Sequence, residues 1–419
     1  MSVALAARRD DRDLGALRGA FPALAAAGGT LHYLDNAATT QKPSAVIDAV
    51  RRSLAHGQGP VHRGLYPLAD AASAAYEEAR ARVARFVGAA DAAEIVFTRS
   101  ATESINLVAE GWLRPRLRPG DRVWVTRMEH HANFLPWQRV CRATGAELRV
   151  VELDEEGRLD LGGAPDLFDP RTRLIALCQV SNVLGLENPV REVCRLAAAA
   201  GIAVLVDAAQ SVPHQAVDVR ELGCDFFAFS AHKVYGPGGI GALYGRPARL
   251  EETEPLLVGG GMVDLVEDAE ASWAPVPGRF EAGSPNLAGA VGFAAAVDWA
   301  SGVGLERIRA QVTDLTRQAM AALGEIPGLR LLPTEHARPA SIVSFDLTGV
   351  HPHDVAQVAG ERGVAVRAGH HCAQPLMRHL GLAATVRASF AAYNDAADVT
   401  ALVEAVDAAG RLFRPQRAR

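Results

Sequence analysis

Two apolar runs in the middle of the chain decide the fold: IAVLVDAAQ at residues 202–210 and DFFAFSAHK at residues 225–233. Each run has the length and composition of a strand that is buried on both faces. Neighbouring parallel strands bring their carboxyl ends to one edge of the sheet, where open α/β sheets bind their ligands. The two runs therefore predict a crevice in which Asp207, Gln210 and Lys233 converge.

Strand-length apolar runs alternate with helix-length segments from about residue 90 to residue 245. This alternation predicts an α/β fold with a mainly parallel central sheet flanked by helices on both faces. The predicted strands are 94–98, 122–126, 147–153, 174–180, 202–207, 225–230 and 239–244, and predicted helices between them include 103–117, 134–144 and 190–200.

After residue 286 the pattern changes to one that predicts a smaller α+β domain. Helical stretches at 287–301 and 305–323 precede strands at 341–347, 364–367 and 387–390 and a last helix at 396–413. We expect residues 1–30, with a helix near 13–24, to pack on this small domain. Residues 31–286 are then the large ligand-binding domain, and residues 287–419 the small C-terminal domain.

Composition narrows the classes of function. The 419 residues carry a net charge of -5, which provides no electrostatic argument for binding nucleic acid or an anionic membrane. The first residues lack the pattern of a signal peptide, and no apolar run reaches the ~20 residues of a membrane span. The five cysteines are scattered without a Cys-x-x-Cys pair, so we expect no disulfide framework and a reducing cytoplasm.

Lysine is rare in this chain. Only Lys42 and Lys233 are lysines among the 43 basic residues, which suggests that a retained lysine needs an amine that can lose its proton. For Lys42, chance retention is an equally good explanation. Lys233 follows a predicted strand beside Asp207, and pyridoxal phosphate requires this pair: a lysine that forms a Schiff base and an aspartate that keeps the pyridine nitrogen protonated.

The segment RSATE at 99–103 follows a predicted strand and opens a helix, which is a natural phosphate site. The alternative is a simple capping box of Ser100 and Glu103, and both interpretations are compatible because they use the same geometry. The segment GPGGIG at 236–241 matches a dinucleotide motif, but a strand follows it where that motif needs a helix.

Two histidine-containing segments complete the candidate chemistry. His130, in EHHAN at 129–133, follows a strand and can stack on a flat ring; a metal site is the rival, and it lacks a spaced third ligand. Cys372 lies in VRAGHHCAQP at 366–375, where neighbouring His and Arg favour a thiolate. The other four cysteines are expected to be buried and inert. Arg387 could bind a substrate carboxylate through two bonds.

Eight blocks spread over almost the whole chain resemble one family. Taken together they resemble the SufS-like, or group II, cysteine desulfurases, a group that includes selenocysteine lyases and belongs to the class V aminotransferases of fold-type I. The blocks are YLDNAA (33–38), VHRG (61–64), MEHHAN (128–133), VSNVLG (180–185), DAAQ (207–210), SAHK (230–233), FEAGSPN (280–286) and RAGHHCA (367–373).

The resemblance implies a fold-type I transferase that binds pyridoxal 5'-phosphate and no metal. Lys233 would carry the cofactor, Asp207 would pair with the pyridine nitrogen, and Gln210 would contact the phenolic oxygen. The ring would stack on His130, which joins Lys233 and Cys372 as a catalytic residue. The phosphate would be held by Ala101, Thr102, Ser230, His232 and, from the other subunit of a homodimer, Ser284. Ala101 and Ser284 stand where relatives usually have threonine.

The resemblance also implies a substrate and a partner. Asn182 and Arg387 would hold the carboxylate of L-cysteine, with Arg367 and His62 nearby. Cys372 would take the sulfur as a persulfide, leaving L-alanine, and pass it to a SufE-like or SufU-like acceptor for iron–sulfur cluster assembly or another sulfur metabolism. The alternatives are a selenocysteine lyase or another class V aminotransferase-type enzyme, and an aminotransferase would have no use for Cys372.

Overall fold

The computed structural model describes residues 14–333 and 339–413. Its centre is a seven-stranded sheet of order β2-β8-β7-β6-β5-β3-β4, in which only β8 runs against the others. The predicted α/β fold with a mainly parallel sheet is therefore confirmed. The strands are β2 (Ile95–Thr98), β3 (Arg122–Thr126), β4 (Glu147–Val151), β5 (Thr172–Cys178), β6 (Ala203–Asp207), β7 (Phe226–Ser230) and β8 (Gly241–Gly245).

The two central strands are buried along their whole length, as their apolar sequences predict. They pair in parallel, with Asp207 opposite Ala228. β6 therefore ends at Asp207, and β7 continues two residues further before the short 3-10 turn η6 (Ala231–Lys233). This register brings Asp207 and Lys233 to the same edge of the sheet.

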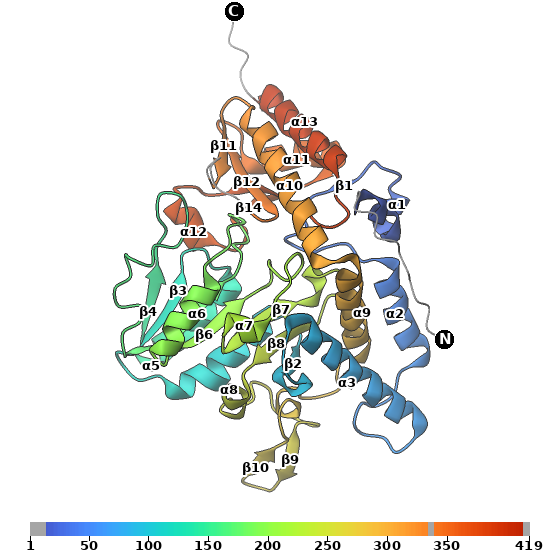
Figure 1. Ribbon diagram of the computed structural model, residues 1–419, viewed down its shortest axis with the longest axis vertical. Helices are drawn as coiled ribbons and strands as arrows, with labels where there is room; N and C mark the ends of the chain where they lie inside the picture. Colours follow the sequence, from blue (N-terminus) through green and yellow to red (C-terminus); the bar gives the residue numbers. More distant parts are fainter. Residues whose placement is uncertain (1–13, 334–338, 414–419) are drawn as a thin grey trace, which may run out of the picture.

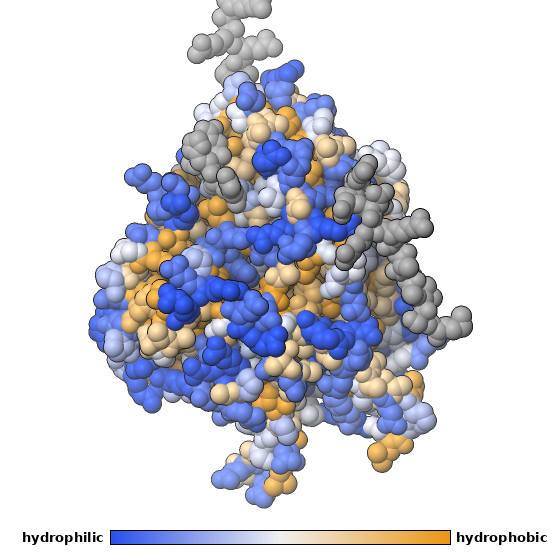
Figure 2. Space-filling view, in the orientation of Figure 1, coloured by the Kyte–Doolittle hydropathy of each residue, from blue (hydrophilic) through white to orange (hydrophobic). Residues whose placement is uncertain are grey.

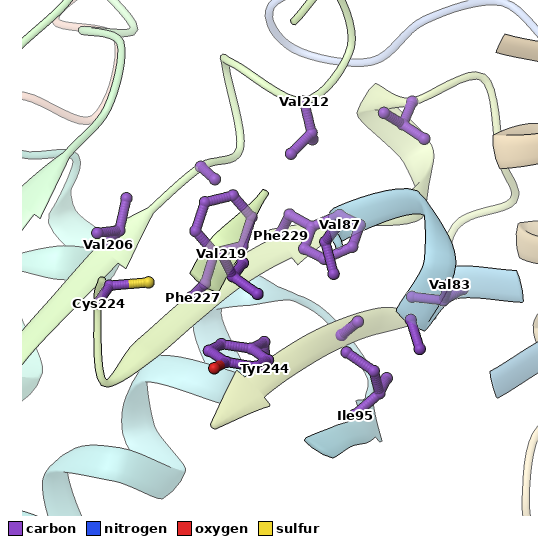
Figure 3. Close-up of a cluster of buried hydrophobic side chains, with 14 of the residues drawn as sticks. Val83, Val87, Ile95, Val206, Val212, Val219, Cys224, Phe227, Phe229 and Tyr244 are labelled. Carbon is purple, nitrogen blue, oxygen red and sulfur yellow. The ribbon is translucent and has the colours of Figure 1, made fainter. Parts of the chain in front are cut away.

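Alternate residues of the strands face two different cores. Phe227 and Phe229 join one buried cluster, and Phe226 and Ala228 join another, as the two-residue period of a strand requires. Figure 3 shows Phe227 and Phe229 in the first cluster together with Val87 of α3. The helices from residue 44 to residue 303 are α2 (Ser44–His56), α3 (Pro67–Val87), α4 (Ala101–Leu107), α5 (Leu135–Thr144), α6 (Val190–Ala199), α7 (Val219–Leu222), α8 (Pro247–Glu251) and α9 (Leu287–Val303). The last of these, α9, begins where the small domain is expected to begin, yet it packs on α2 and α3.

The helix predicted at 103–117 is not continuous. After α4 the backbone forms a π-helical turn, η3 (Val108–Leu113), and a 3-10 turn, η4 (Arg114–Arg116). Pro115 has no N–H to donate to the carbonyl oxygen of Gly111, and that oxygen accepts the N–H of Glu254 at 3.1 Å instead. The segment therefore leaves α-helical geometry.

The small domain gathers at the end of the molecule that is drawn uppermost in Figure 1. Its antiparallel sheet has the order β11-β12-β15-β14. The strand predicted at 364–367 is two strands: β13 pairs with β1 (His32–Tyr33), and β14 pairs with β15. The elements are α10 (Leu305–Gly324), β11 (Leu329–Leu332), β12 (Ile342–Leu347), α11 (Pro352–Glu361), β13 (Val364–Ala365), β14 (Arg367–Gly369), α12 (Gln374–His379), β15 (Thr385–Ser389) and α13 (Ala396–Phe413).

The N-terminal helical segment consists of η1 (Leu14–Ala20) and α1 (Pro22–Ala26), and residue 13 of the predicted helix lies outside the described residues. Phe21 is buried, and its ring centroid lies 4.5 Å from that of Tyr393 in the small domain and 5.3 Å from that of Trp299 of α9. The contact with Tyr393 is compatible with the expected packing on the small domain, which stays a prediction. The domain boundaries themselves stay a prediction.

A two-stranded hairpin of β9 (Val263–Val266) and β10 (Ala271–Trp273) projects from the end opposite the small domain (Figure 1). Hydrophilic and hydrophobic residues are interspersed over the face drawn in Figure 2. Among the described residues no single helix is long and apolar enough to cross a membrane, and α9 and α10 meet that test only as a pair bent by 75°. The remaining short turns are η2 (Ala92–Glu94), η5 (His131–Asn133) and η7 (Gly278–Phe280).

Candidate active site

One pocket lies at the carboxyl ends of β3, β5, β6 and β7 and is closed on its other side by small-domain residues. It brings together every predicted site residue except Ser284 and His62. The predicted residues that line it are Ala101, Thr102, His130, Asn182, Asp207, Gln210, Ser230, His232, Lys233, Arg367, Cys372 and Arg387.

Lys233 and Asp207 are the oppositely charged groups at the strand ends of this pocket; Asp207 is buried, and Lys233 is partly buried. Burial lowers the pKa of Lys233 to about 8, although the charge of Asp207 opposes the shift. Burial likewise raises the pKa of Asp207, against the opposing charge of Lys233 and an N–H from Ala209 that donates to Oδ1 at 3.0 Å. Lys233 can therefore supply a neutral amine at much lower pH than an exposed lysine.

His130 lies at the start of η5, directly after β3. Burial, with the nearby charge of Lys233, lowers its pKa to about 3, so the imidazole is neutral. Its Nδ1 accepts the backbone N–H of Ala132 at 3.0 Å, which leaves the proton on Nε2. A neutral ring held by its own turn is well suited to stack on a flat ligand.

Glu129, the residue before His130, is fully buried behind the pocket and was assigned no role from the sequence. Thr126 Oγ1 and Asn133 Nδ2 each donate to its carboxylate at 2.6 Å, and the N–H of Cys178 donates at 2.9 Å. Burial raises the pKa of Glu129 to about 7. These bonds join the ends of β3 and β5 to the turn that carries His130.

The first turn of α4, which follows β2, is capped by a residue at the end of another strand, β7. Ser230 Oγ, at the end of β7, accepts the N–H of Ala101 at 2.8 Å. The capping box of Ser100 and Glu103, the alternative interpretation of this segment, is not formed: the side chain of Ser100 makes no cap bond, and Glu103 accepts the N–H of Arg99 and not that of Ser100. Because Ser230 comes from a distant part of the chain, local sequence could not reveal it as the cap.

Arg387 forms the other end of the pocket. It is fully buried, and burial lowers its pKa to about 10 against the opposing charge of Asp35. Nη1 donates to the backbone oxygen of Asn182 at 2.9 Å, and Nη2 donates to Asp35 Oδ1 at 3.2 Å. Within the described residues, Nε of Arg387 and Oδ1 of Asn182 have no hydrogen-bond partner. Arg367 is the cross-strand neighbour of Arg387.

Cys372 lies between β14 and α12, as the sequence predicts, in a turn of unusual backbone geometry. His371 and Cys372 have φ values of 51° and 55°, a left-handed conformation that non-glycine residues seldom adopt. The turn is held by Asn182 Nδ2, which donates to the His371 oxygen at 2.7 Å, and by the N–H of His131, which donates to the Cys372 oxygen at 2.7 Å. Such geometry is maintained only where the surroundings enforce it.

The thiols fall into two classes. Cys372 is partly exposed in the pocket, whereas the other four cysteines are buried, as expected. Burial raises the pKa of each of these four: Cys141, Cys178, Cys194 and Cys224.

Two predicted residues lie outside the pocket. Ser284 lines a neighbouring cavity together with Arg99 and Glu103. The side chain of His62 is half exposed, and its Nε2 lies 3.1 Å from a carboxylate oxygen of Glu77. In residues 14–333 and 339–413, no group of three or more His, Cys, Asp or Glu is arranged to hold a metal ion.

Comparison with known proteins gives a consistent result. Residues 32–402 match the family described as aminotransferase class-V. A cysteine desulfurase of Dickeya dadantii is 46% identical over 387 residues, which cover 92% of this chain and 93% of that one. Cysteine desulfurase CsdA of Escherichia coli superposes with a TM-score of 0.89 at 42% identity, covering 96% of this chain and all of that one. The apo cysteine desulfurase of Thermococcus onnurineus NA1 gives 0.90 at 38% identity, covering 96% and 98%.

Proposed function

This chain belongs to the class-V aminotransferase family, within its cysteine desulfurases, and we propose that it uses pyridoxal 5'-phosphate bound at Lys233 to convert L-cysteine to L-alanine. The observation that carries the proposal is one pocket that joins a buried aspartate to a partly buried lysine and a partly exposed cysteine.

The residues present fit the cofactor. Burial leaves Asp207 without a full counter-charge, and a protonated pyridine nitrogen would supply one. The neutral ring of His130 offers a stacking face, and Gln210, held by a 2.9 Å bond from Nε2 to the Ala37 oxygen, would contact the phenolic oxygen. Thr102, Ser230 and His232 line the part of the pocket near the start of α4, where we place the phosphate.

When bound, pyridoxal phosphate acts as an electron sink for the substrate. Lys233 then has two tasks, holding the cofactor and taking the α-proton of the substrate at Nζ, and its lowered pKa suits the second. Asp207 would pair with the ring nitrogen, whose positive charge would favour the ionised carboxylate.

The substrate carboxylate fits the opposite end of the pocket. Arg387 Nε is a buried donor that lacks an acceptor, and a carboxylate would satisfy it. The amide of Asn182 lies beside it, and Arg367 adds a second positive charge. The turn that carries Cys372 lines the same pocket, and we propose that the side chain of the bound amino acid points towards it.

Cys372 receives the sulfur. Its thiolate forms a bond to the substrate sulfur as the bond from that sulfur to Cβ breaks. The electron pair of the broken bond stays with Cβ, which takes up a proton and becomes the methyl group of alanine, and a persulfide remains on Cys372. We propose that the persulfide passes to a SufE-like or SufU-like acceptor for iron–sulfur cluster assembly or another sulfur metabolism. We further propose a cytoplasmic homodimer in which Ser284 reaches the phosphate bound by the partner subunit.

The test is to incubate the purified protein, supplied with pyridoxal phosphate, with cysteine and a reductant and to measure sulfide and alanine. We expect equal amounts of both, lost in Lys233→Ala and in Cys372→Ser. Cys141→Ser is the matched control, because it changes a buried thiol outside the pocket. A yellow protein that forms neither product would contradict cysteine as substrate and favour selenocysteine or amino-group transfer.

A further inference from the structure

The carbonyl oxygen of His232, the residue directly before Lys233, is surrounded by donors from one loop. The N–H of Thr40 donates to it at 3.0 Å, Thr39 Oγ1 at 3.0 Å and Lys42 Nζ at 3.1 Å. The hydroxyl of Thr40 lies 3.2 Å from the same oxygen. The peptide group that leads into Lys233 is therefore held by residues 39–42, far away in the sequence.

The shape of its ammonium group suits Lys42 to this position. Its ammonium donates to Thr39 Oγ1 at 3.1 Å, to the Thr40 oxygen and to the His232 oxygen, so all three N–H groups have acceptors. An ammonium directs three donors outward from one nitrogen atom and can reach all three of these acceptors. The donors of a guanidinium lie in one plane on three nitrogen atoms, and they cannot match this arrangement of acceptors. The sequence keeps a lysine here although nearly all its other basic residues are arginine.

The same loop also holds the backbone just after Lys233. Tyr235 has a φ of 60°, and its N–H donates to Thr40 Oγ1 at 2.9 Å. Its hydroxyl accepts the N–H of Ala392 at 3.2 Å. The turn from 231 to 235 is thus fixed on both sides of Lys233, and it depends on the loop to hold a left-handed residue.

We propose that Lys42 is a positioning residue for Lys233: its ammonium anchors the His232 carbonyl and so sets the direction in which Lys233 Nζ enters the pocket. Lys42 is not among the residues that line the pocket, so it acts through the backbone and not by touching a ligand. The inference deepens the proposed function and rests on the role given there to Lys233.

The test compares Lys42→Met, Lys42→Arg and the control Arg51→Met, which removes an exposed cation of α2 whose only ion pair among the described residues is with Asp48. In the apoprotein, deuterium exchange of the peptide covering residues 231–236 should accelerate about tenfold in both Lys42 variants. After loading with pyridoxal phosphate, the pH midpoint of the cofactor's visible absorbance should shift by about one unit. We expect kcat to fall about tenfold with KM for cysteine little changed.

Wild-type exchange and an unchanged midpoint in a folded Lys42→Met protein would overturn the proposal, as would a Lys42→Arg variant that behaves like wild type. If Lys42→Met does not fold, Thr39→Val takes its place, because it removes an acceptor of Lys42 and a donor to His232. Borohydride reduction and mass spectrometry of the wild type test the proposed function separately. Failure to find the cofactor on Lys233 would refute that function, while the apoprotein exchange result would still report on Lys42.

Discussion

Arg387 Nη2 donates to Asp35 Oδ1 at 3.2 Å, so the cation that faces the substrate end of the pocket already has an anionic partner. Asp35 belongs to the segment after β1, which pairs with the small domain, and Arg387 lies on β15 of that domain. Arg387 is fully buried, and Asp35 offsets part of the cost of burying its charge when no substrate is bound.

We expect Asp35→Asn to lower the stability of the apoprotein and to tighten substrate binding. Removing one partner of a largely buried ion pair should cost about 2–3 kcal/mol of unfolding free energy. The guanidinium then has no competing anion, so KM for cysteine should fall several-fold. Steady-state kinetics and thermal unfolding measure the two effects, and Arg387→Lys is the comparison in which KM should rise about tenfold or more. A higher KM in Asp35→Asn would mean that Asp35 mainly orients the guanidinium.

The lowered pKa of Lys233 makes the stability of the apoprotein depend on pH. Lys233 has a pKa of about 8 when folded and about 10.5 when unfolded, so the unfolded chain binds more protons between these values. The charged lysine therefore destabilises the fold below pH 8, by about 3 kcal/mol, and this cost disappears as the pH rises towards 10.5.

It follows that apo Lys233→Met should unfold at a higher temperature than the wild type at pH 7, and that the difference should vanish near pH 10.5. Thermal unfolding of both apoproteins over this range makes the comparison. A gap that stays constant with pH would show that packing, and not the proton on Lys233, separates the two proteins.

Cys372 should be the one fast-reacting thiol of the chain. The other four cysteines are buried with raised pKa values, so at neutral pH they offer little thiolate to an alkylating reagent. We expect about one equivalent of iodoacetamide to react quickly, and peptide mapping to find it at Cys372. The fast phase should be absent in Cys372→Ser and retained in Cys141→Ser; a fast phase that survives in Cys372→Ser would place the reactive thiol elsewhere.

The sequence predicted those parts of the site that follow directly from strand ends. Asp207 and Lys233 come immediately after two apolar strands, and parallel pairing alone brings them to one edge of the sheet. The role of Ser230 as the cap of α4 was missed, because that bond joins residues 129 positions apart. The break in the helix at 103–117 was also missed, although Pro115 is a local signal against a continuous helix; only the bond from Glu254 to the Gly111 oxygen lies beyond local sequence.

Ser284 and His62 show a different limit of prediction from the sequence. Both were assigned from the resemblance, and in the single chain they lie outside the pocket. Their roles depend on a second subunit or on a ligand and remain predictions. Glu129 was quoted in a motif but given no role, because nothing in the sequence distinguishes a buried carboxylate at the centre of three donors from an exposed one.

Glu129 leads to the last prediction. Its carboxylate accepts from the hydroxyl of Thr126, the amide of Asn133 and the N–H of Cys178, so its surroundings consist of donors. Glu129→Gln keeps the shape but turns an NH₂ group towards one of those donors. The mismatch should cost about 1–3 kcal/mol of stability and loosen the turn that carries His130.

We therefore expect Glu129→Gln to unfold at a lower temperature and to bind pyridoxal phosphate more weakly, although Glu129 does not line the pocket. Equilibrium titration of the apoprotein with the cofactor measures the second effect. Glu152→Gln is the matched control, because Glu152 is an acidic residue half exposed at the surface and paired with Arg127. A loosened turn must weaken stacking of the cofactor on the ring of His130. If Glu129→Gln lowered the melting temperature but bound the cofactor as tightly as the wild type, the hydrogen bonds to Glu129 would therefore support the strands without positioning His130.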